Sequence, residues 1–406
     1  MGDIERYIVE FLLYGNSEAV SQVGYTANEE EWSHYKVVIV PSGHLRHDLV
    51  RPDLGRVEIE KRERIVPDES EEPITNNLSP ITIIKTDIIY NTFFFISRAE
   101  ELLTDERDEH GRFAARYSML GRKNRLQIPL IDEYARILMK ALELDLPAPG
   151  FSHIYLTHDV DTIAHYRHLR GFLGGLLRGQ GRRAWAAQKD IRRDPAYTFP
   201  WLIKQDSKLV ESRKSKVESQ ESIVDSIYFI KHTRGRGYDY PQYDLRKRDY
   251  RYLEHELTAS GAKLGLHSSY YGEIIDPMPL HRSHYLRCSI DQMQRLADAG
   301  ITDDFTIGFP DAAGFRLQTT RPVRWINPKT YTLTSLTLHP LTVMDVTLSN
   351  AGYMHLSEDE AYFLCQQLFD KIRQYQGEAV LLWHNSNIGS GTYHRDLYPK
   401  LLQLLQ

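Results

Sequence analysis

The chain has 406 residues, of which 41% are hydrophobic and 26% charged, and its formal net charge is −5. This length predicts two or three domains, and the composition is typical of a globular protein. A slightly acidic chain has no general attraction to nucleic acid. Its longest apolar runs are far shorter than the roughly 20 residues that a membrane-spanning helix needs.

Two features bear on the compartment in which the protein acts. The opening segment, MGDIERYIVEFLLYGN, carries acids where a secretory signal peptide has basic residues before its apolar core. Only two cysteines occur, Cys288 and Cys365, too few for a disulfide framework or a thiolate zinc site. We therefore expect a cytoplasmic protein that binds no nucleic acid.

The first elements along the chain predict a small mixed α/β region. An apolar patch at 7–13 indicates a helix, and the run VVIVPS at 37–42 indicates a strand. The segment SPITIIKTDIIYNTFFFISRAEELL then changes from the β-branched composition of a strand to that of a helix. We place the start of this helix at Ser97, with Glu100 three residues later as its capping-box partner.

An amphipathic helix is expected at 131–144, where apolar side chains recur along one stripe. The turn-forming sequence PAPG at 147–150 follows it and marks the predicted domain boundary. The chain is therefore divided into an N-terminal domain, 1–147, and a larger domain, 148–406.

The larger domain alternates short, nearly all-apolar strands with helical stretches, which is typical of a parallel sheet covered by helices. The expected strands are 153–161, 225–230, 263–269, 305–310, 340–348 and 378–385. The expected helices are 249–261, 283–300 and 357–375. Side chains capable of chemistry close four of the strands, at the end where barrels place their active sites.

The first of these strands ends in LTHDVD. Strand alternation puts Asp159 and Asp161 on one side, about 7 Å apart. Two such carboxylates repel each other unless a cation or a shared proton separates their roles. One of them could hold a divalent metal while the other acts as a base; alternatively, both belong to a turn that caps a helix.

Two histidines close later strands, His267 in GLHSSYYG and His384 in AVLLWHN. Imidazole together with carboxylate suits zinc with an open position for water and substrate. His384 is suited to general-acid work because the pKa of histidine lies near neutral pH. Each could instead be a structural imidazole. Arg316 and Asp345, near two further strand ends, could orient the base or form a salt bridge.

In chain order, LTHDVD, GLHSSYY, GFPDAAGFR, PLTVMD and LLWHN resemble the motifs of the polysaccharide deacetylases (carbohydrate esterase family four). More narrowly, they resemble a bacterial branch with an HDVD motif and an N-terminal companion domain, which TNN, FFFISRAEE and DEHGRF also resemble. The resemblance covers nearly the whole chain. It implies a distorted (β/α) barrel of about seven strands at 148–406, after a companion domain at 1–147.

The resemblance also implies an activity, the hydrolysis of N- or O-acetyl groups on sugars. It makes Asp159 the general base, Asp161 and His267 ligands of a divalent metal, with zinc the expected ion, and His384 the general acid. The base would take a proton from the attacking water, the metal would polarise the acetyl carbonyl, and the acid would protonate the leaving amine or alcohol.

The same resemblance gives Arg316 the role of steadying the base and matches Asp345 to the acidic fourth motif. The chain departs from the family at the second motif, where Tyr271 stands in place of a histidine. A phenol is a poor zinc ligand at neutral pH because its ordinary pKa is about 10. The third metal ligand is therefore open among water, Tyr271, His284 and His165.

Residues 167–193 form a basic run, with eight arginines and lysines against the single acid Asp190, and GFLGGLL lies inside it. This run predicts contact with an anionic glycan or with lipid head groups, or else an ordinary solvated lid helix.

The leading functional hypothesis is a cytoplasmic, metal-dependent deacetylase that acts on a surface-polysaccharide precursor, anionic or lipid-linked. Two alternatives stay open. One is a non-catalytic carbohydrate-binding protein on the same barrel, and the other is an amidase that acts on a non-sugar amide.

Overall fold

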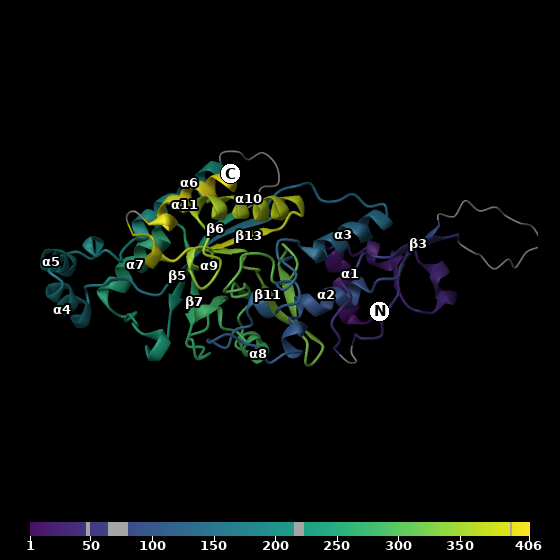
Figure 1. Ribbon diagram of the computed structural model, residues 1–406, viewed down its shortest axis with the longest axis horizontal. Helices are drawn as coiled ribbons and strands as arrows, with labels where there is room; N and C mark the ends of the chain where they lie inside the picture. The colour runs from purple at the N-terminus through teal and green to yellow at the C-terminus, as the bar shows by residue number, and fades with distance from the viewer. Residues whose placement is uncertain (46–48, 64–79, 215–222, 390–391) are drawn as a thin grey trace, which may run out of the picture.

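Two β-sheets organise the computed structural model, which describes residues 1–45, 49–63, 80–214, 223–389 and 392–406. The smaller sheet lies toward the end of the molecule that holds the N-terminus, on the right in Figure 1, and the larger sheet occupies the middle. Helices accompany both sheets, so the predicted α/β class is confirmed. The TNN motif, at 75–77, lies outside the described residues.

The smaller sheet has the strand order β1-β2-β4-β3, in which only β3 is antiparallel to its neighbour. Its strands are β1 (Val23–Tyr25), β2 (Val37–Ile39), β3 (Ile59–Arg62) and β4 (Ile81–Ile84). The helices of this region are α1 (Asp3–Leu12), α2 (Ile88–Ile96) and α3 (Leu130–Ala141). Their apolar faces share one core with Val37, Ile39 and Ile84 of the sheet.

Helix α2 corrects the helix that we placed from Ser97 onward. It begins after Asp87, whose side chain accepts a hydrogen bond from the backbone N–H of Tyr90, and it ends at Ser97. Every residue of α2 is buried. A helix that is covered on all sides has no polar stripe, and for that reason its sequence resembles a buried strand.

The larger sheet has the strand order β10-β11-β9-β8-β7-β6-β5-β13-β12, and all neighbours are parallel except the pair β10 and β11. The strands are β5 (His153–Val160), β6 (Ile223–Lys231), β7 (Lys263–Ser268), β8 (Leu280–Ser283), β9 (Asp303–Asp304), β10 (Val323–Asn327), β11 (Thr332–Leu338), β12 (Val343–Met344) and β13 (Glu378–Leu382).

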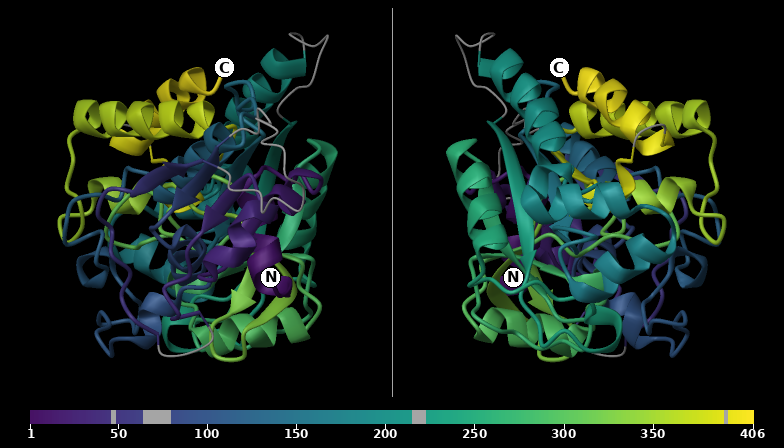
Figure 2. Two further views of the ribbon diagram at one scale, coloured as in Figure 1. Left: turned by 90° about the vertical axis from the view of Figure 1, so that its right-hand side faces the viewer. Right: turned by 90° about the vertical axis from the view of Figure 1, so that its left-hand side faces the viewer.

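Helices lie on this sheet and beyond its edges (Figures 1 and 2). They are α4 (Leu169–Leu177), α5 (Gly181–Lys189), α6 (Phe199–Lys214), α7 (Arg248–Ala259), α8 (Ile290–Asp298), α9 (Asp345–Ser349), α10 (Glu358–Gln374) and α11 (Tyr393–Leu404). None of the helices in the described part of the chain combines the length and the apolar composition that crossing a bilayer requires.

The sheet differs from the expected barrel of about seven strands. It has nine strands, and its edge strands β10 and β12 do not pair with each other within the described ranges, so the sheet is an open, curled half-barrel. The strand expected at 305–310 is replaced by the short β9, because Gly308 and Pro310 interrupt a regular ladder. The first residues of the helix expected at 283–300 belong to β8 and a 3₁₀ turn.

One hydrophobic core joins the two sheets. Helix α2 contacts β10, and the fully buried Trp325 of β10 donates a hydrogen bond from its indole to the carbonyl of Ser97, at 3.2 Å. Asp132 of α3 accepts hydrogen bonds from Thr319 and Arg321 at 2.7 and 2.9 Å. Because these contacts fix the N-terminal region, 1–147, against the larger sheet, residues from both parts can line a common cavity.

Candidate active site

A cavity of about 1060 Å³ opens at the carboxyl ends of the parallel strands. Asp159 and Asp161 line it from the end of β5, Lys231 from the end of β6, His284 from the residues after β8, and His384 from the residues after β13. Open parallel sheets and barrels alike place their sites at this end. The cavity is therefore the candidate active site.

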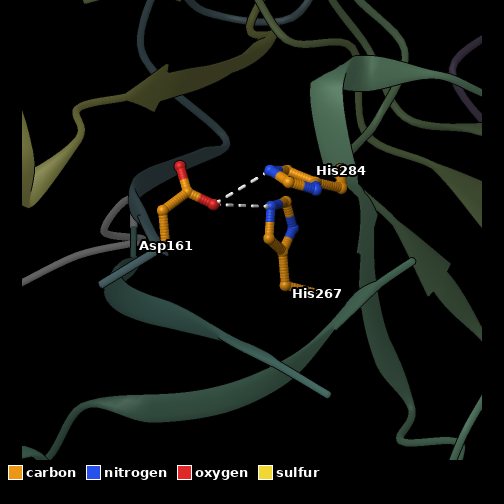
Figure 3. Close-up of side chains that lie close together, drawn as sticks. All are labelled: Asp161, His267 and His284. Atoms are coloured by element: carbon orange, nitrogen blue, oxygen red, sulfur yellow. Dashed lines mark ion pairs between the residues drawn. The ribbon is translucent and has the colours of Figure 1, made fainter. Parts of the chain in front are cut away.

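Asp161 and His284 line the cavity, and the fully buried His267 points toward them (Figure 3). The Oδ1 atom of Asp161 lies 3.6 Å from Nε2 of His267 and 3.2 Å from Nε2 of His284. Burial opposes ionisation of Asp161, but the nearby imidazoles of His267 and His284 hold the pKa of its carboxyl well below the ordinary value. The carboxylate is therefore the ionised form, which is the form that binds a cation.

Two observations test whether these residues fit a metal ion. The Oδ1 atom of Asp161 and the Nε2 atom of His267 are buried and have no hydrogen-bond partner, whereas buried polar atoms are nearly always paired. One ligand atom from each of the three side chains lies within 4.8 Å of the others. Two imidazoles and a carboxylate also form a ligand set typical of zinc with an open fourth position. The residues fit a divalent cation.

The other ring nitrogens of both histidines are already engaged. Nδ1 of His267 lies 3.0 Å from the carbonyl oxygen of Arg282, and Nδ1 of His284 lies 2.9 Å from Oδ1 of the buried Asp239. Metal-binding histidines usually donate their second ring N–H to a carbonyl or a carboxylate, which fixes the tautomer. In both residues Nε2 is thereby left free to bind a cation.

Asp159 is held by a buried arginine. Nη1 of Arg282 donates to Oδ1 of Asp159 at 3.2 Å and to Oγ1 of Thr157 at 2.7 Å. The guanidinium also donates from Nε to the carbonyl of Phe305 and lies over the ring of Phe229. Because these contacts fix the arginine, they fix the position of the carboxylate and leave its Oδ2 atom facing the cavity.

His384 faces Asp159 across the site, with Nε2 3.9 Å from Oδ2 of that carboxylate. Its Nδ1 lies 2.7 Å from Oδ1 of Asp345, whose Oδ2 accepts hydrogen bonds from the backbone N–H of His384 and from Asn387. Burial disfavours the charged imidazole, but Asp345 outweighs it and raises the pKa of His384 to about 9. His384 can therefore carry a proton at neutral pH.

Two residues proposed from the sequence lie elsewhere. Arg316 is buried between Glu101, which it meets at 2.7 Å, and the carbonyl of Gly308, so it joins the N-terminal region to the larger sheet. Tyr271 is 43% exposed, its ring lies beneath the guanidinium of Arg236, and it is not among the residues that line the cavity. Arg282, and not Arg316, contacts Asp159. His284, which is one of the candidates for the third metal ligand, lies beside Asp161.

Arg282 and His284 come from the short β8 and the residue after it. Strand alternation in LHRSH puts Arg282 and His284 on one side of the chain, which is the signal that could have identified them together. We had instead included Ser283 and His284 in a helix. His165, the remaining candidate ligand, lines the cavity with Nε2 3.3 Å from Arg178.

The N-terminal region supplies part of the cavity wall, which the sequence did not reveal. The lining residues from this region are Asp108, Glu109, His110, Arg112 and Arg116. Arg112 is fixed by Asp108, at 2.7 Å, and donates to the carbonyl of Tyr285 and the hydroxyl of Tyr353. The DEHGRF motif is thus part of the site.

Ser268, His281 and Asp304 form a second polar array beside β8. The serine Oγ lies 2.8 Å from Nε2 of the histidine, and the histidine Nδ1 lies 2.8 Å from the aspartate. This is the bonding order of a serine-hydrolase triad, but all three side chains are fully buried. No substrate can reach the hydroxyl, so the array stabilises the junction of β7, β8 and β9.

Residues 6–147 match the model of a family described as "Family of unknown function (DUF7033)". No curated protein matches the chain. Among solved structures, the chain is similar to one described as "putative polysaccharide deacetylase from Mycobacterium smegmatis". The two are 13% identical, the TM-score is 0.37, and the match covers 64% of this chain and 87% of that chain.

Proposed function

We propose that the protein is a metal-dependent hydrolase of the polysaccharide deacetylase type, which removes acetyl groups from a carbohydrate. One observation carries the proposal. Three side chains that fit a cation, Asp161, His267 and His284, lie beside a fixed carboxylate, Asp159. The imidazole of His384, which can carry a proton, faces the same carboxylate. Binding a sugar requires neither a base nor an acid, whereas hydrolysis of an amide or ester requires both.

A divalent cation bound by the three ligands would supply Lewis acidity toward an acyl oxygen. The chain's own residues perform the proton transfers. Asp159, held by Arg282, takes a proton from water through its Oδ2 atom. His384 donates the proton on Nε2 to the leaving nitrogen or oxygen, while Asp345 keeps the imidazole oriented. With 3.9 Å between them, both groups can reach the same acyl group.

The lining of the cavity supports a carbohydrate as substrate. Four tyrosines, Tyr238, Tyr240, Tyr285 and Tyr353, line it together with arginines, lysine and carboxylates. Aromatic rings offer apolar faces to the C–H surfaces of a sugar, and the charged groups can hydrogen-bond its hydroxyls. The assignment to a surface-polysaccharide precursor rests on the motif resemblance of the sequence.

Metal content and acetate release test this function. We expect about one equivalent of zinc or another divalent ion in the purified protein, lost in Asp161→Ala, and acetate release from N- or O-acetylated sugars. Asp159→Asn should keep the ion and lose at least about a hundredfold in kcat, because general-base catalysis contributes about that much. Asp370→Asn, an exposed carboxylate of α10, is the matched control.

Each contrary result removes a defined part of the proposal. Purified protein that takes up no divalent ion would overturn the ligand set. A metal-loaded protein that cleaves non-sugar amides and no acetylated sugar would overturn the substrate class. A metal-loaded protein that binds sugars but releases no acetate would be the non-catalytic alternative.

A further inference from the structure

Helices α4 and α5 form a hairpin at the end of the molecule opposite the smaller sheet (Figures 1 and 2). The two helices contact each other, and a small core of Tyr166, Phe172, Ala184 and Ala187 fixes them. We call this unit, 169–189, the terminal hairpin. Its helix α4 buries glycines and exposes leucines, whereas an ordinary surface helix buries its leucines.

The inward face of α4 is made of glycine. Gly171 and Gly175 are buried, and a Cβ atom would lie 1.8 Å from the carbonyl of His165 at the first position and 2.8 Å from the ring of Tyr166 at the second. Only glycine therefore allows α4 to approach the body of the protein this closely. The leucines of the helix are left for the opposite face.

That outward face is an apolar stripe. Leu169, Leu173 and Leu177 recur every four residues and are 74%, 47% and 90% exposed, and Trp185 of α5 is 58% exposed. A surface helix normally buries its leucines and exposes polar residues. Large exposed apolar groups gathered on one element mark a contact with a partner or with a membrane.

Exposed basic side chains are frequent in and next to the terminal hairpin, and they indicate the chemistry of the partner. The exposed ones are Arg170, Arg178, Arg182, Arg183, Lys189, Arg192 and Arg193. The one acidic side chain among residues 167–193, Asp190, is paired with Arg192. An anionic bilayer offers hydrocarbon and phosphate side by side, which matches exposed leucines next to an excess of positive charge.

The terminal hairpin also borders the candidate active site. Arg170, Gly171 and Arg178 line the same cavity as Asp161 and His384. A surface that meets the terminal hairpin therefore lies next to the entrance of the cavity.

We propose that the terminal hairpin docks on the surface of an anionic lipid bilayer. The stripe of Leu169, Leu173 and Leu177, with Trp185, enters the boundary between head groups and acyl chains, and the arginines contact the lipid phosphates. Where the proposed deacetylase function holds, this docking defines the substrate class as a saccharide carried on a membrane lipid, presented to the cavity from the bilayer surface.

Vesicle sedimentation tests the proposal with the full-length protein. Wild type should sediment with vesicles of phosphatidylcholine and phosphatidylglycerol and not with phosphatidylcholine alone. Leu173→Ser/Leu177→Ser should lower the vesicle affinity about tenfold or more, because it removes two of the four inserted apolar side chains. Phe363→Ser, which is 61% exposed on α10, is the matched control and should sediment like wild type.

Charge reversal provides an independent arm. Arg182→Glu/Arg183→Glu on α5 should lower the affinity about tenfold or more. Arg136→Glu/Lys140→Glu on the distant α3 changes the net charge equally and should leave it unchanged. Trp185 is the exposed one of the five tryptophans, so brominated lipids should quench part of the fluorescence of wild type and much less of Trp185→Phe.

Three results would overturn the proposal. They are no sedimentation of wild type, equal sedimentation of the leucine variant, or a dimer in solution that the leucine variant abolishes while vesicles bind neither protein. Metal content and acetate release from a small soluble substrate are measured on the same variants. A wild type that hydrolyses the soluble substrate but binds no vesicles refutes the docking alone. A wild type that binds vesicles without any hydrolysis refutes the deacetylase alone.

Discussion

Arg282 is the residue on which the position of the proposed base depends. Its planar guanidinium meets Thr157, Asp159 and the carbonyl of Phe305 at once. A lysine offers a single ammonium group and cannot reproduce this fork. We expect Arg282→Lys to lower kcat about ten- to a hundredfold with little change in KM, because a displaced base loses its attack geometry.

Steady-state kinetics on an acetylated sugar, with metal content measured in parallel, checks this expectation. The metal should stay bound, since His267 is oriented by the backbone carbonyl of residue 282 and not by its side chain. A raised KM with unchanged kcat would show that Arg282 contacts substrate and does not position the base.

Asp345 sets the protonation of the proposed acid. The pKa of His384 is raised to about 9 against the effect of burial, and Asp345 is the main cause of the rise. An acid must be protonated to act, so wild-type activity should fall as the pH rises through about 9. Asp345→Asn removes the negative charge, and the alkaline limb of kcat/KM should move toward the ordinary histidine value of about 6.5. An unmoved limb would contradict this assignment.

The side chains at strand ends were the most predictable part of the site. Asp159, Asp161, His267, Asp345 and His384 lie together because parallel strands bring their carboxyl ends to one edge. Which arginine reaches a buried carboxylate is decided by packing between strands that are distant in the sequence. The motif order indicated Arg316, whose side chain instead meets Glu101.

At the scale of elements, β8 was the least predictable and the most consequential. It has four residues between two parallel neighbours, and Tyr285 and Leu286 after it take left-handed backbone conformations, with φ of 61° and 54°. A strand this short carries too few residues for periodicity to separate it from the following helix. Helix α8 starts only after Ser289, which caps it.

His339 connects three strands of the larger sheet. Following β11, its ring lies 3.0 Å from Asp303 of β9 and 2.7 Å from Glu378 of β13. Burial opposes the imidazolium, but these carboxylates raise its pKa to about 9. A raised folded-state pKa stabilises the fold fully below about pH 6.5, and this contribution is lost as the pH rises through about 9.

Urea unfolding at pH 6 and pH 9.5 checks the contribution of this histidine. Wild type should lose stability between the two, on the order of 3 kcal/mol from this group. His339→Gln should be less stable at pH 6 and should lose less between the two conditions. An equal loss in both proteins would show that other groups govern the pH dependence.

For the whole molecule, the sequence predicted the α/β class and the order of most elements, but not the openness of the sheet. Which strand forms the edge of a sheet depends on what covers it, and the edge strand β10 packs against α2 of the N-terminal region. No local pattern in 323–338 predicts contact with α2, which lies more than two hundred residues earlier. The division at 147 stays a prediction.

The contact between the two sheets also gives the N-terminal region a part in the cavity wall. Arg112 crosses from it to the hydroxyl of Tyr353 and the carbonyl of Tyr285 in the cavity wall. We expect Arg112→Met to raise KM about tenfold with little change in kcat, because charged hydrogen bonds that shape the wall are lost away from the reacting atoms. Kinetics against Arg122→Met, an exposed arginine of the same region, checks this. A loss confined to kcat would contradict it.

The shared core has a consequence for how such proteins can be recombined. Trp325 donates to Ser97, and Asp132 binds Thr319 and Arg321. The boundary predicted at residue 147 therefore does not coincide with a boundary in the packing. A chimera that exchanged only the leading 147 residues would graft a foreign surface onto an unmatched hairpin. A chimera should therefore exchange that region together with β10 and β11, because they share one core.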